Sequence, residues 1–256
     1  MPYVPTPYLL VEQDGPVTIL TINNPDMRNA FVDEIHEAMQ EIWMHLAADD
    51  SVRAVVLTGA GKAFSAGGNI PDFIKSYEDP DHRRRSLRGA KRLMDAMAEF
   101  PKPVVAAVNG AAVGLGCNVA VGCDIVIMGE SSFFADTHVS IGLVCGDGGA
   151  VFWPLFMSIL QAKEYLLTGD RIPPAKAVEL GLANRVVPDD QLMTEAIALA
   201  QRLAKQPHQA IQETKRAINL HIQAAIQLVA PFALSAEAES FATEDIRKTI
   251  EGFKKK

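Results

Sequence analysis

The chain begins with a pattern of short apolar runs and longer amphipathic stretches. Two β-rich runs, Leu9 to Glu12 and Val17 to Ile22, flank the turn signal Asp14-Gly15-Pro16 and predict a hairpin. From Val32 to Ala48, apolar residues recur at steps of three and four, which predicts an amphipathic helix. The chain therefore opens with two strands and one helix.

Three further runs are short and largely apolar, as buried parallel strands require: Arg53 to Thr58, Lys102 to Val108 and Ile125 to Met128. Helical stretches near Asp72 to Tyr77 and Arg83 to Phe100 separate them. Strands that alternate with helices place the fold in the α/β class.

Beyond about Pro188 the strand pattern ends, and a helical pattern with predicted breaks at Pro207 and Pro231 follows. We therefore divide the chain into a core that carries the site, residues 1–188, and a helical C-terminal region, residues 189–256.

Composition excludes several classes of function. The 256 residues are 48% hydrophobic, enough for a sizeable core, and the net charge of −7 argues against sequence-independent nucleic-acid binding. No apolar run approaches the roughly 18 residues of a membrane span, and the first residues lack the pattern of a signal peptide. Three cysteines without ligand spacing predict free thiols and no metal site. We expect a cytoplasmic protein with no membrane contact.

Two glycine-rich loops carry the first chemical signal. Thr58 to Ile70 (TGAGKAFSAGGNI) and Asn109 to Asn118 (NGAAVGLGCN) each leave a predicted strand and enter a helix. Such a turn directs unpaired N–H groups and the positive end of a helix dipole at one point, which suits a developing negative charge. A single loop of this kind more often serves only a tight turn. Two glycine-rich loops that each follow a predicted parallel strand favour an oxyanion site.

The sequence resembles the crotonase (enoyl-CoA hydratase/isomerase) superfamily over nearly its whole length. The resemblance rests on the blocks LTGAGKAFSAGGNI at 57–70, KPVVAAVNGAAVGLGCNVAVGCDIVI at 102–127, and LLTGDRIPPAKAVELGLANRVV at 166–187, together with Asn24-Pro25, Arg28-Asn29-Ala30, the stretch 134–149, and Glu251-Gly252-Phe253. It implies a spiral of ββα units with a helical C-terminal region that serves as an oligomerisation and lid region.

The resemblance also implies an acyl-CoA substrate, a homo-trimer or hexamer, no tightly bound cofactor, and a role in reactions such as those of fatty acid metabolism. The family's oxyanion-hole donors fall on the N–H groups of Gly68 and Leu115. Its coenzyme contacts fall on the following residues: Arg28 for the phosphates, the backbone around Ser65, Ala66 and Asn69 for adenine and pantetheine, and Phe253 and Lys254 in the basic tail.

The catalytic positions depart from the hydratase pattern. Where enoyl-CoA hydratases of this family carry two glutamates, this chain has Asn118 and His138. An amide cannot exchange a proton with substrate at neutral pH, whereas a histidine, with an ordinary pKa near 6.5, can act as a general base. Asp147 follows His138 in the same region and could fix its tautomer. Asn118 could orient water or a substrate carbonyl.

The His138–Asp147 pair and Trp153-Pro154 resemble the branch typified by 6-oxocamphor hydrolase, in which histidine activates water for retro-Claisen cleavage of cyclic β-diketones. The coenzyme-type segments RNAF and SAGGNI, however, favour a CoA thioester. Three functions stay open: a hydratase-like lyase with His138 as acid/base, a C–C bond hydrolase, and a non-catalytic acyl-CoA-binding homologue. The run Arg83 to Arg88 could neutralise coenzyme phosphates, but a solvated helix face is the favoured interpretation.

Overall fold

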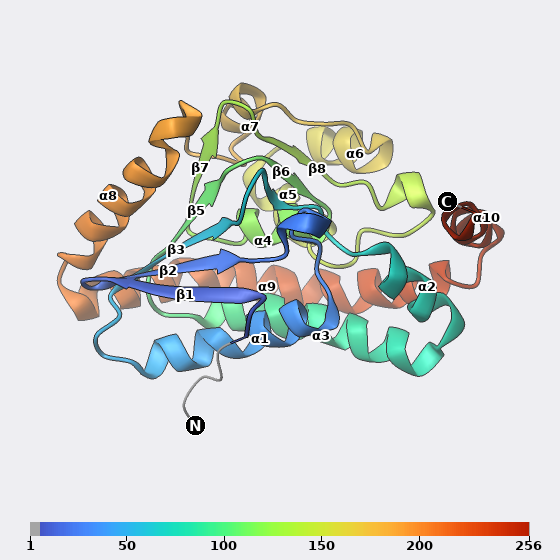
Figure 1. Cartoon of the computed structure of the whole chain (residues 1–256), viewed down its shortest axis with the longest axis horizontal. Coiled ribbons are helices and arrows are strands. Elements are labelled where there is room, and N and C mark those ends of the chain that lie inside the picture. The colour runs from blue at the N-terminus through green and yellow to red at the C-terminus, as the bar shows by residue number, and fades with distance from the viewer. Residues whose placement is uncertain (1–5, 256) are drawn as a thin grey trace.

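The computed structural model describes residues 6–255, whose strands form two sheets (Figure 1). The larger has the order β1-β2-β3-β5-β7-β9, with strands β1 (Leu9–Asp14), β2 (Val17–Ile22), β3 (Ala54–Gly59), β5 (Val104–Val108), β7 (Ile125–Gly129) and β9 (Arg185–Val187). The smaller sheet has the order β4-β6-β8, with strands β4 (Ala63–Ser65), β6 (Ala111–Val113) and β8 (Phe133–Ala135). All pairs are parallel except the predicted hairpin β1–β2.

The chain winds through both sheets in repeated units. Each unit adds one strand to the large sheet, the next to the small sheet, and then turns into helix. The helices that follow the three small strands are α2 (Ile70–Glu78) with α3 (Pro80–Glu99), α4 (Leu115–Val121), and the 3-10 turn η2 (Val139–Ile141) with α5 (Gly149–Phe156). This confirms the predicted α/β spiral of ββα units. Because β4, β6 and β8 pair in parallel, their carboxyl ends lie along the same edge of the small sheet.

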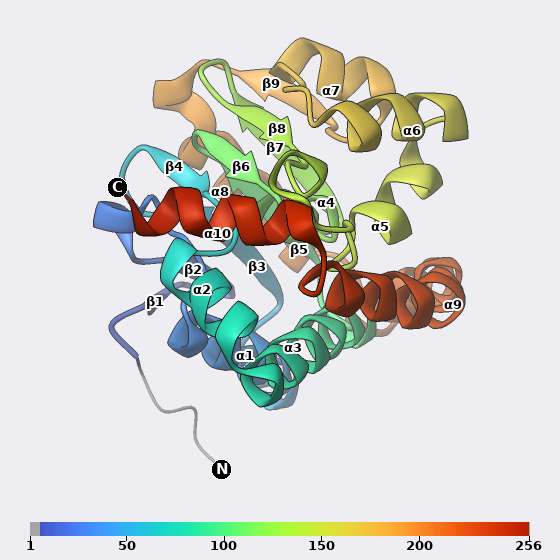
Figure 2. The ribbon, with the colours of Figure 1, turned by 90° about the vertical axis from the view of Figure 1, so that its right-hand side faces the viewer.

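The remaining helices cover the two sheets. They are η1 (Pro25–Met27), α1 (Asp33–Ala48), α6 (Ile159–Thr168), α7 (Pro174–Leu180), η3 (Asp189–Gln191), α8 (Leu192–Ala204), α9 (His208–Ser240) and α10 (Glu244–Lys254). One face of the large sheet packs its alternate residues against the apolar side of α8, while the other face belongs to a larger core with α1, α3 and α9. Figure 2 shows α10 crossing in front of the molecule beside α2, and Phe253 and Phe73 both pack against the small buried cluster of Leu143, Phe241, Ile246 and Ile250.

Helix α9 passes through Pro231 without the break predicted from the sequence. Proline lacks the N–H that would bond the carbonyl four residues earlier, so it weakens a helix by itself. Here the neighbouring Ala230, Ala233 and Leu234 are buried against the rest of the molecule, and this packing holds the helix together. The break at Pro207 was predicted correctly, since Pro207 precedes the first residue of α9.

Helix α9 is long and apolar enough to cross a membrane by length and composition alone, and it is the one such helix within residues 6–255. It packs along α3 and α5, however, and its Asn219 amide donates to the Ala98 carbonyl at 2.9 Å. Its opposite side exposes Ile218, Leu220, Leu228 and Phe232. Helix α9 therefore has one packed face and one exposed apolar face.

A buried ammonium group fixes α9 to the large sheet. Lys215 Nζ donates to the Lys102 carbonyl at 2.8 Å and to Asp124 Oδ2 at 2.7 Å, and Asp124 also accepts from the Val104 N–H at 2.7 Å. Lys102 in turn donates to two carbonyls at the end of α1. One network therefore joins α1, the start of β5 and α9.

Replacing Lys215 with methionine is expected to lower the free energy of unfolding by about 3 kcal/mol, because the variant leaves the Asp124 carboxylate without its cation. Chemical denaturation measures this change. Arg216→Met is the matched control, since Arg216 is exposed and pairs with Glu213 one helical turn away. Equal losses in the two variants would contradict the proposed contribution of the buried pair.

Candidate active site

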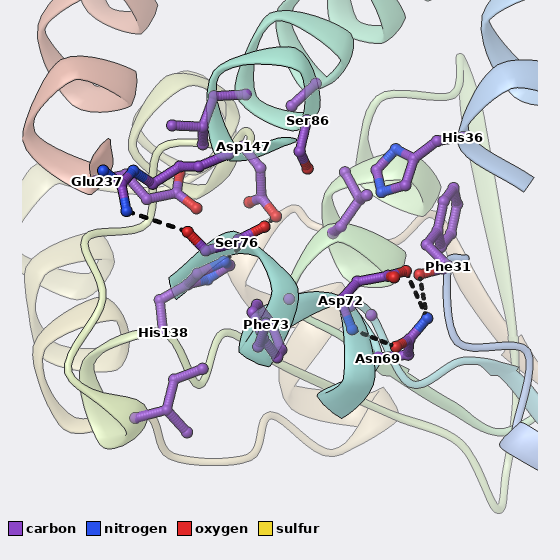
Figure 3. A pocket seen from close by; sticks show the side chains of 18 of the residues that line it. Phe31, His36, Asn69, Asp72, Phe73, Ser76, Ser86, His138, Asp147 and Glu237 are labelled. Carbon is purple, nitrogen blue, oxygen red and sulfur yellow. Dashed lines mark hydrogen bonds and ion pairs between the residues drawn. The ribbon is translucent and has the colours of Figure 1, made fainter. Parts of the chain in front are cut away.

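One cavity lies among the ends of β4 and β6, the helices α2 and α3, and the loop after β8 (Figure 3). Figure 3 shows His138 and Glu237 toward one side of it and Phe31 and His36 toward the other. Gly68, Leu115, His138 and Asp147, all predicted from the sequence to belong to the site, are among the residues that line this cavity. The spiral of ββα units thus brings together residues that are distant in the sequence.

The two glycine-rich loops touch each other at the cavity. Gly67 has a φ of +82°, and a Cβ placed there would lie 2.5 Å from the Val113 carbonyl oxygen and 3.6 Å from the Leu115 nitrogen. Only glycine allows both this conformation and this approach. Within residues 6–255, neither the Gly68 N–H nor the Leu115 N–H donates a hydrogen bond. Two free donors on adjoining loops therefore face one cavity.

The second loop starts a helix at the donor itself. Leu115 is the first residue of α4, and the preceding Gly114 has a φ of +52° and donates its N–H to the Ala135 carbonyl. The first N–H groups of a helix have no partner inside it. Gly116 allows α4 to approach β4 closely, because a Cβ there would lie 2.6 Å from the Ser65 Cβ. Glycine at this position therefore determines where the Leu115 N–H lies.

His138 lies between two carboxylates. Its Nδ1 is 2.6 Å from Asp136 Oδ1, and its Nε2 is 3.2 Å from Asp147 Oδ2. Burial acts to lower the pKa of the imidazolium, but the two carboxylates outweigh burial and raise the pKa of His138 well above its ordinary value. The same ion pair lowers the pKa of Asp136 in spite of burial. The two carboxylates therefore favour the charged, imidazolium form of His138.

Asn118 is occupied by protein partners. Its Nδ2 donates to Asp147 Oδ1 at 2.8 Å and lies 3.4 Å from Asp136 Oδ2, and its Oδ1 accepts from Trp153 Nε1 at 3.1 Å. The indole N–H fixes the orientation of the amide, because an amide oxygen accepts and an amide nitrogen donates. Asn118 is buried and is not among the residues that line the cavity. The amide therefore holds Asp147, and its partners in this arrangement are protein groups.

Glu237 is a cavity residue that the sequence did not reveal. It lies on α9 with 6% of its surface exposed, and its Oε2 has no hydrogen-bond partner within the described chain. Burial, together with the charges of Asp147 and Asp136, raises the pKa of Glu237 to about 8, although the His138 charge opposes the shift. Glu237 is therefore a neutral carboxylic acid at pH 7. Helical periodicity alone gives no signal for such a role.

Glu237→Gln is expected to change the pH dependence of stability. In the folded protein Glu237 keeps its proton up to about pH 8, whereas the unfolded chain releases it near 4.5. This group therefore contributes stability that is fully present below pH 4.5 and is lost as the pH rises to 8.

Glutamine does not titrate. As the pH rises from 5 to 8, the free energy of unfolding of the variant should therefore increase by roughly 3 kcal/mol relative to that of the wild-type protein. Denaturation curves of both proteins at several pH values measure the difference. Parallel curves would show that Glu237 ionises normally. Glu239→Gln, on the same helix, is the control.

The predicted coenzyme residues fall into two sets. Ala66, Asn69 and Phe253 line the cavity. Arg28, Ser65 and Lys254 do not: Arg28 ends η1 with a φ of +52°, the Ser65 hydroxyl donates to the Asn29 carbonyl, and Lys254 pairs with Glu78 of α2. Asn69 also begins α2, where its side chain accepts from the Asp72 N–H at 2.8 Å. The basic end Lys256 lies outside the described residues, as do residues 1–5 of the segment considered for a signal peptide.

A second cluster of polar side chains lies on the other side of the cavity. The Ser76 hydroxyl is 3.0 Å from His82 Nδ1, and His82 Nε2 is 3.3 Å from both Asp33 oxygens, while Asp33 also accepts from Lys75. Burial lowers the pKa of the nearby His36 to about 4, which leaves it neutral at pH 7. These contacts join α1, α2 and α3. No motif or periodicity in the sequence distinguishes these residues from others on their helices.

Two groups of side chains have a spacing that could hold a metal ion: Asp33, Asp72 and His82, and Asp136, His138 and Asp147. In the second group, both imidazole nitrogens already face carboxylate oxygens. A metal would have to displace these ion pairs and the proton that they share. The three side chains of this group are therefore already paired with one another through shared protons.

The chain is similar to known proteins over almost its whole length. The family model of enoyl-CoA hydratase/isomerase matches residues 12–256. A short-chain-enoyl-CoA hydratase of Clostridium acetobutylicum is 33% identical over 96% of this chain and 97% of its own length. The 1,2-epoxyphenylacetyl-CoA isomerase of Escherichia coli is 35% identical over 83% of this chain and 82% of its own.

Solved structures show the same likeness. The crystal structure of an enoyl-CoA hydratase/isomerase from Mycobacterium paratuberculosis superposes with a TM-score of 0.93 at 44% identity, over 96% of this chain and 98% of that one.

Proposed function

Because the chain belongs to the enoyl-CoA hydratase/isomerase family, we propose that it is an acyl-CoA enzyme that stabilises a thioester enolate. The observation that carries the proposal is the pair of unpaired N–H groups at Gly68 and Leu115, on loops that touch and face one cavity. Two such donors bind the thioester oxygen as negative charge develops on it. Coenzyme A enters as part of the substrate and leaves with the product.

The proton-transfer group in this proposal is the pair of His138 and Asp147, held by Asp136 and Asn118. The cluster sets one imidazole between two carboxylates, so in its unprotonated form it can take one proton from water and later return it. For hydration, the pair removes a proton from water, the oxygen of water bonds to Cβ of the enoyl thioester, and Cα of the enolate then takes a proton. Glu237, which is neutral and lies beside the pair, can donate that last proton, and the proton held by the pair then passes to Glu237 and restores both groups.

The second candidate is a C–C bond hydrolase. The observation that favours it is the ion-paired His138 in place of a second glutamate. Water attacks one ketone of a cyclic β-dicarbonyl, and the bond between that carbonyl carbon and the α-carbon that lies between the two carbonyls breaks. The enolate of the second carbonyl is then protonated at this α-carbon. The product is then a chain with a carboxylate at one end. A third outcome, a non-catalytic acyl-CoA-binding protein, remains for the experiment.

The experiment offers the protein crotonyl-CoA, a cyclic β-keto acyl-CoA, and a free cyclic β-diketone. Products are followed by mass spectrometry in isotopically heavy water and by NMR, which separates a new hydroxyl from a new carboxylate. Water addition to crotonyl-CoA supports the first function and ring opening the second. Binding of CoA esters without turnover would support the non-catalytic function, and absence of CoA-ester binding would overturn the proposal.

The assembly proposed for this chain is a trimer or a hexamer, with residues 189–256 as the oligomerisation and lid region. Exposed apolar residues on α6 and α9 support it, among them Leu160, Leu167, Leu228 and Phe232. Light scattering coupled to size exclusion measures the mass. A monomer at micromolar concentration would contradict this assembly.

A further inference from the structure

Arg83 differs from the other basic residues of its run. Arg84 is 61% exposed and pairs with Asp81, and Arg85 is 67% exposed and lies 4.0 Å from Asp79. Arg83, by contrast, lines the active-site cavity. The interpretation of this run as a solvated helix face therefore holds for Arg84 and Arg85 but is wrong for Arg83.

The guanidinium of Arg83 is held in place but not neutralised. Its Nη1 donates to the Ser76 carbonyl at 3.0 Å, and its Cζ lies 5.3 Å from the centre of the Phe241 ring. Both partners are neutral and both line the cavity. No carboxylate within residues 6–255 forms an ion pair with it. Arginine has five N–H donors, so the group keeps donors for a ligand.

Charge is distributed unevenly around the cavity. Arg83 is the only lysine or arginine among the described lining residues. Asp72 lies beside Phe31 and Asn69 in Figure 3, and its pKa is raised by burial and by the charge of Asp33. Asp33 is paired with Lys75, whereas Asp72 has no ion pair in the described chain and repels an anion from this side of the cavity. An anionic substrate group is therefore directed toward Arg83.

The hollow between α3 and α9 extends this positive region. Arg83 and Leu87 line both the cavity and the hollow. The hollow is also lined by Arg84, Arg88 and Lys91, and its described lining contains no aspartate or glutamate. Lys91 and Arg84 have acidic partners on α3, whereas Arg88 has no ion pair in the described chain. The end of the cavity at Arg83 therefore opens into cationic surroundings.

We propose that Arg83 binds a carboxylate in the acyl part of the substrate or product, so that this enzyme acts on CoA half-esters of dicarboxylic acids. The inference rests on the proposed acyl-CoA function. A guanidinium binds a carboxylate through two parallel N–H···O bonds, a geometry that lysine cannot form. Ring opening of a cyclic β-keto acyl-CoA creates such a carboxylate. The positive charge of Arg83 therefore suits the product of the second candidate reaction.

The test compares the binding of adipoyl-CoA and hexanoyl-CoA by calorimetry. The two ligands share the coenzyme and differ in a terminal carboxylate, so contacts to the coenzyme cancel in the ratio of their Kd values. The wild-type protein should bind adipoyl-CoA about tenfold to a hundredfold more tightly. Arg83→Met should remove this preference, and Arg83→Lys should keep part of it, since charge remains without the two-pronged geometry.

Arg84→Met is the matched control, because Arg84 is adjacent, exposed and already paired. It should leave the preference within about twofold of the wild-type ratio. Equal affinity of the wild-type protein for both esters, or a preference that survives in both Arg83 variants, would overturn the inference while the acyl-CoA function stands. If neither ester binds, the proposed function fails, and the inference with it. Thermal melts of each variant verify that it is folded.

Discussion

His138→Ala is expected to lower kcat/KM for the productive substrate by about a thousandfold, since a positioned acid/base typically contributes about 10²–10⁴ to a rate. The variant also leaves Asp136 and Asp147 without the cation between them. Removal of one member of a buried ion-pair group costs about 3–5 kcal/mol, so the melting temperature should fall as well. The Kd of a saturated acyl-CoA should change little, because His138 acts on the reacting carbons.

Asp147→Asn separates the chemical effect from the structural one. The amide fits the same space and leaves His138 paired with Asp136. Activity should fall by about tenfold to a hundredfold, and the acidic side of the pH–rate profile should shift to lower pH, since the base acts in its unprotonated form and loss of one carboxylate lowers the pKa of His138. Steady-state kinetics on folded protein measures both. Activity of His138→Ala within about tenfold of wild type would remove this histidine from the mechanism.

Gly67→Ala should lower kcat by about a hundredfold. A methyl group at this position meets the Val113 carbonyl at 2.5 Å, and the backbone must move at the point where the two glycine-rich loops touch. The Gly68 and Leu115 N–H groups would then no longer converge, and one lost oxyanion donor costs about 3 kcal/mol in the transition state. Stopped-flow kinetics under saturating substrate measures the rate of the chemical step.

Gly15→Ala is the matched control for this substitution. Gly15 also has a positive φ, +56°, but a Cβ there meets no atom within 4 Å. Both variants bear the cost of an alanine in a left-handed conformation, about 1 kcal/mol of stability. Only Gly67→Ala should lose activity. Equal kcat values for the two variants would indicate that loop contact does not set the oxyanion geometry.

Periodicity predicted the elements whose stability is local or whose burial is complete. The hairpin, α1 and the strands β3, β5 and β7 carry strong patterns and were predicted within a few residues. The strands of the small sheet were missed, because β4, β6 and β8 have only three residues each and follow glycine-rich or turn segments. Nothing in so short a run separates a strand from a loop. Parallel pairing with distant partners makes these strands.

The residues of the candidate active site could also be predicted only in part from the sequence. Asp136 precedes His138 by two residues, yet its contact with Nδ1 depends on how the chain turns after β8. Glu237 and Arg83 lie on helices whose sequences resemble ordinary exposed faces. Each reaches the cavity because α9 and α3 pack together beside it. The glycine-rich loops could be found in advance, since their function depends on backbone geometry that only glycine allows.

The cavity wall has a consequence for how the enzyme matures. Its residues come from α1, α2, α3, the loop before α5, and the late helices α9 and α10. Contacts this distant in sequence form slowly, because the ends of long loops must first meet. The ββα units can pair their strands before α9 brings Glu237 beside His138. During refolding, catalytic activity should therefore recover later than secondary structure, and ligands that span the cavity should stabilise the last elements to dock.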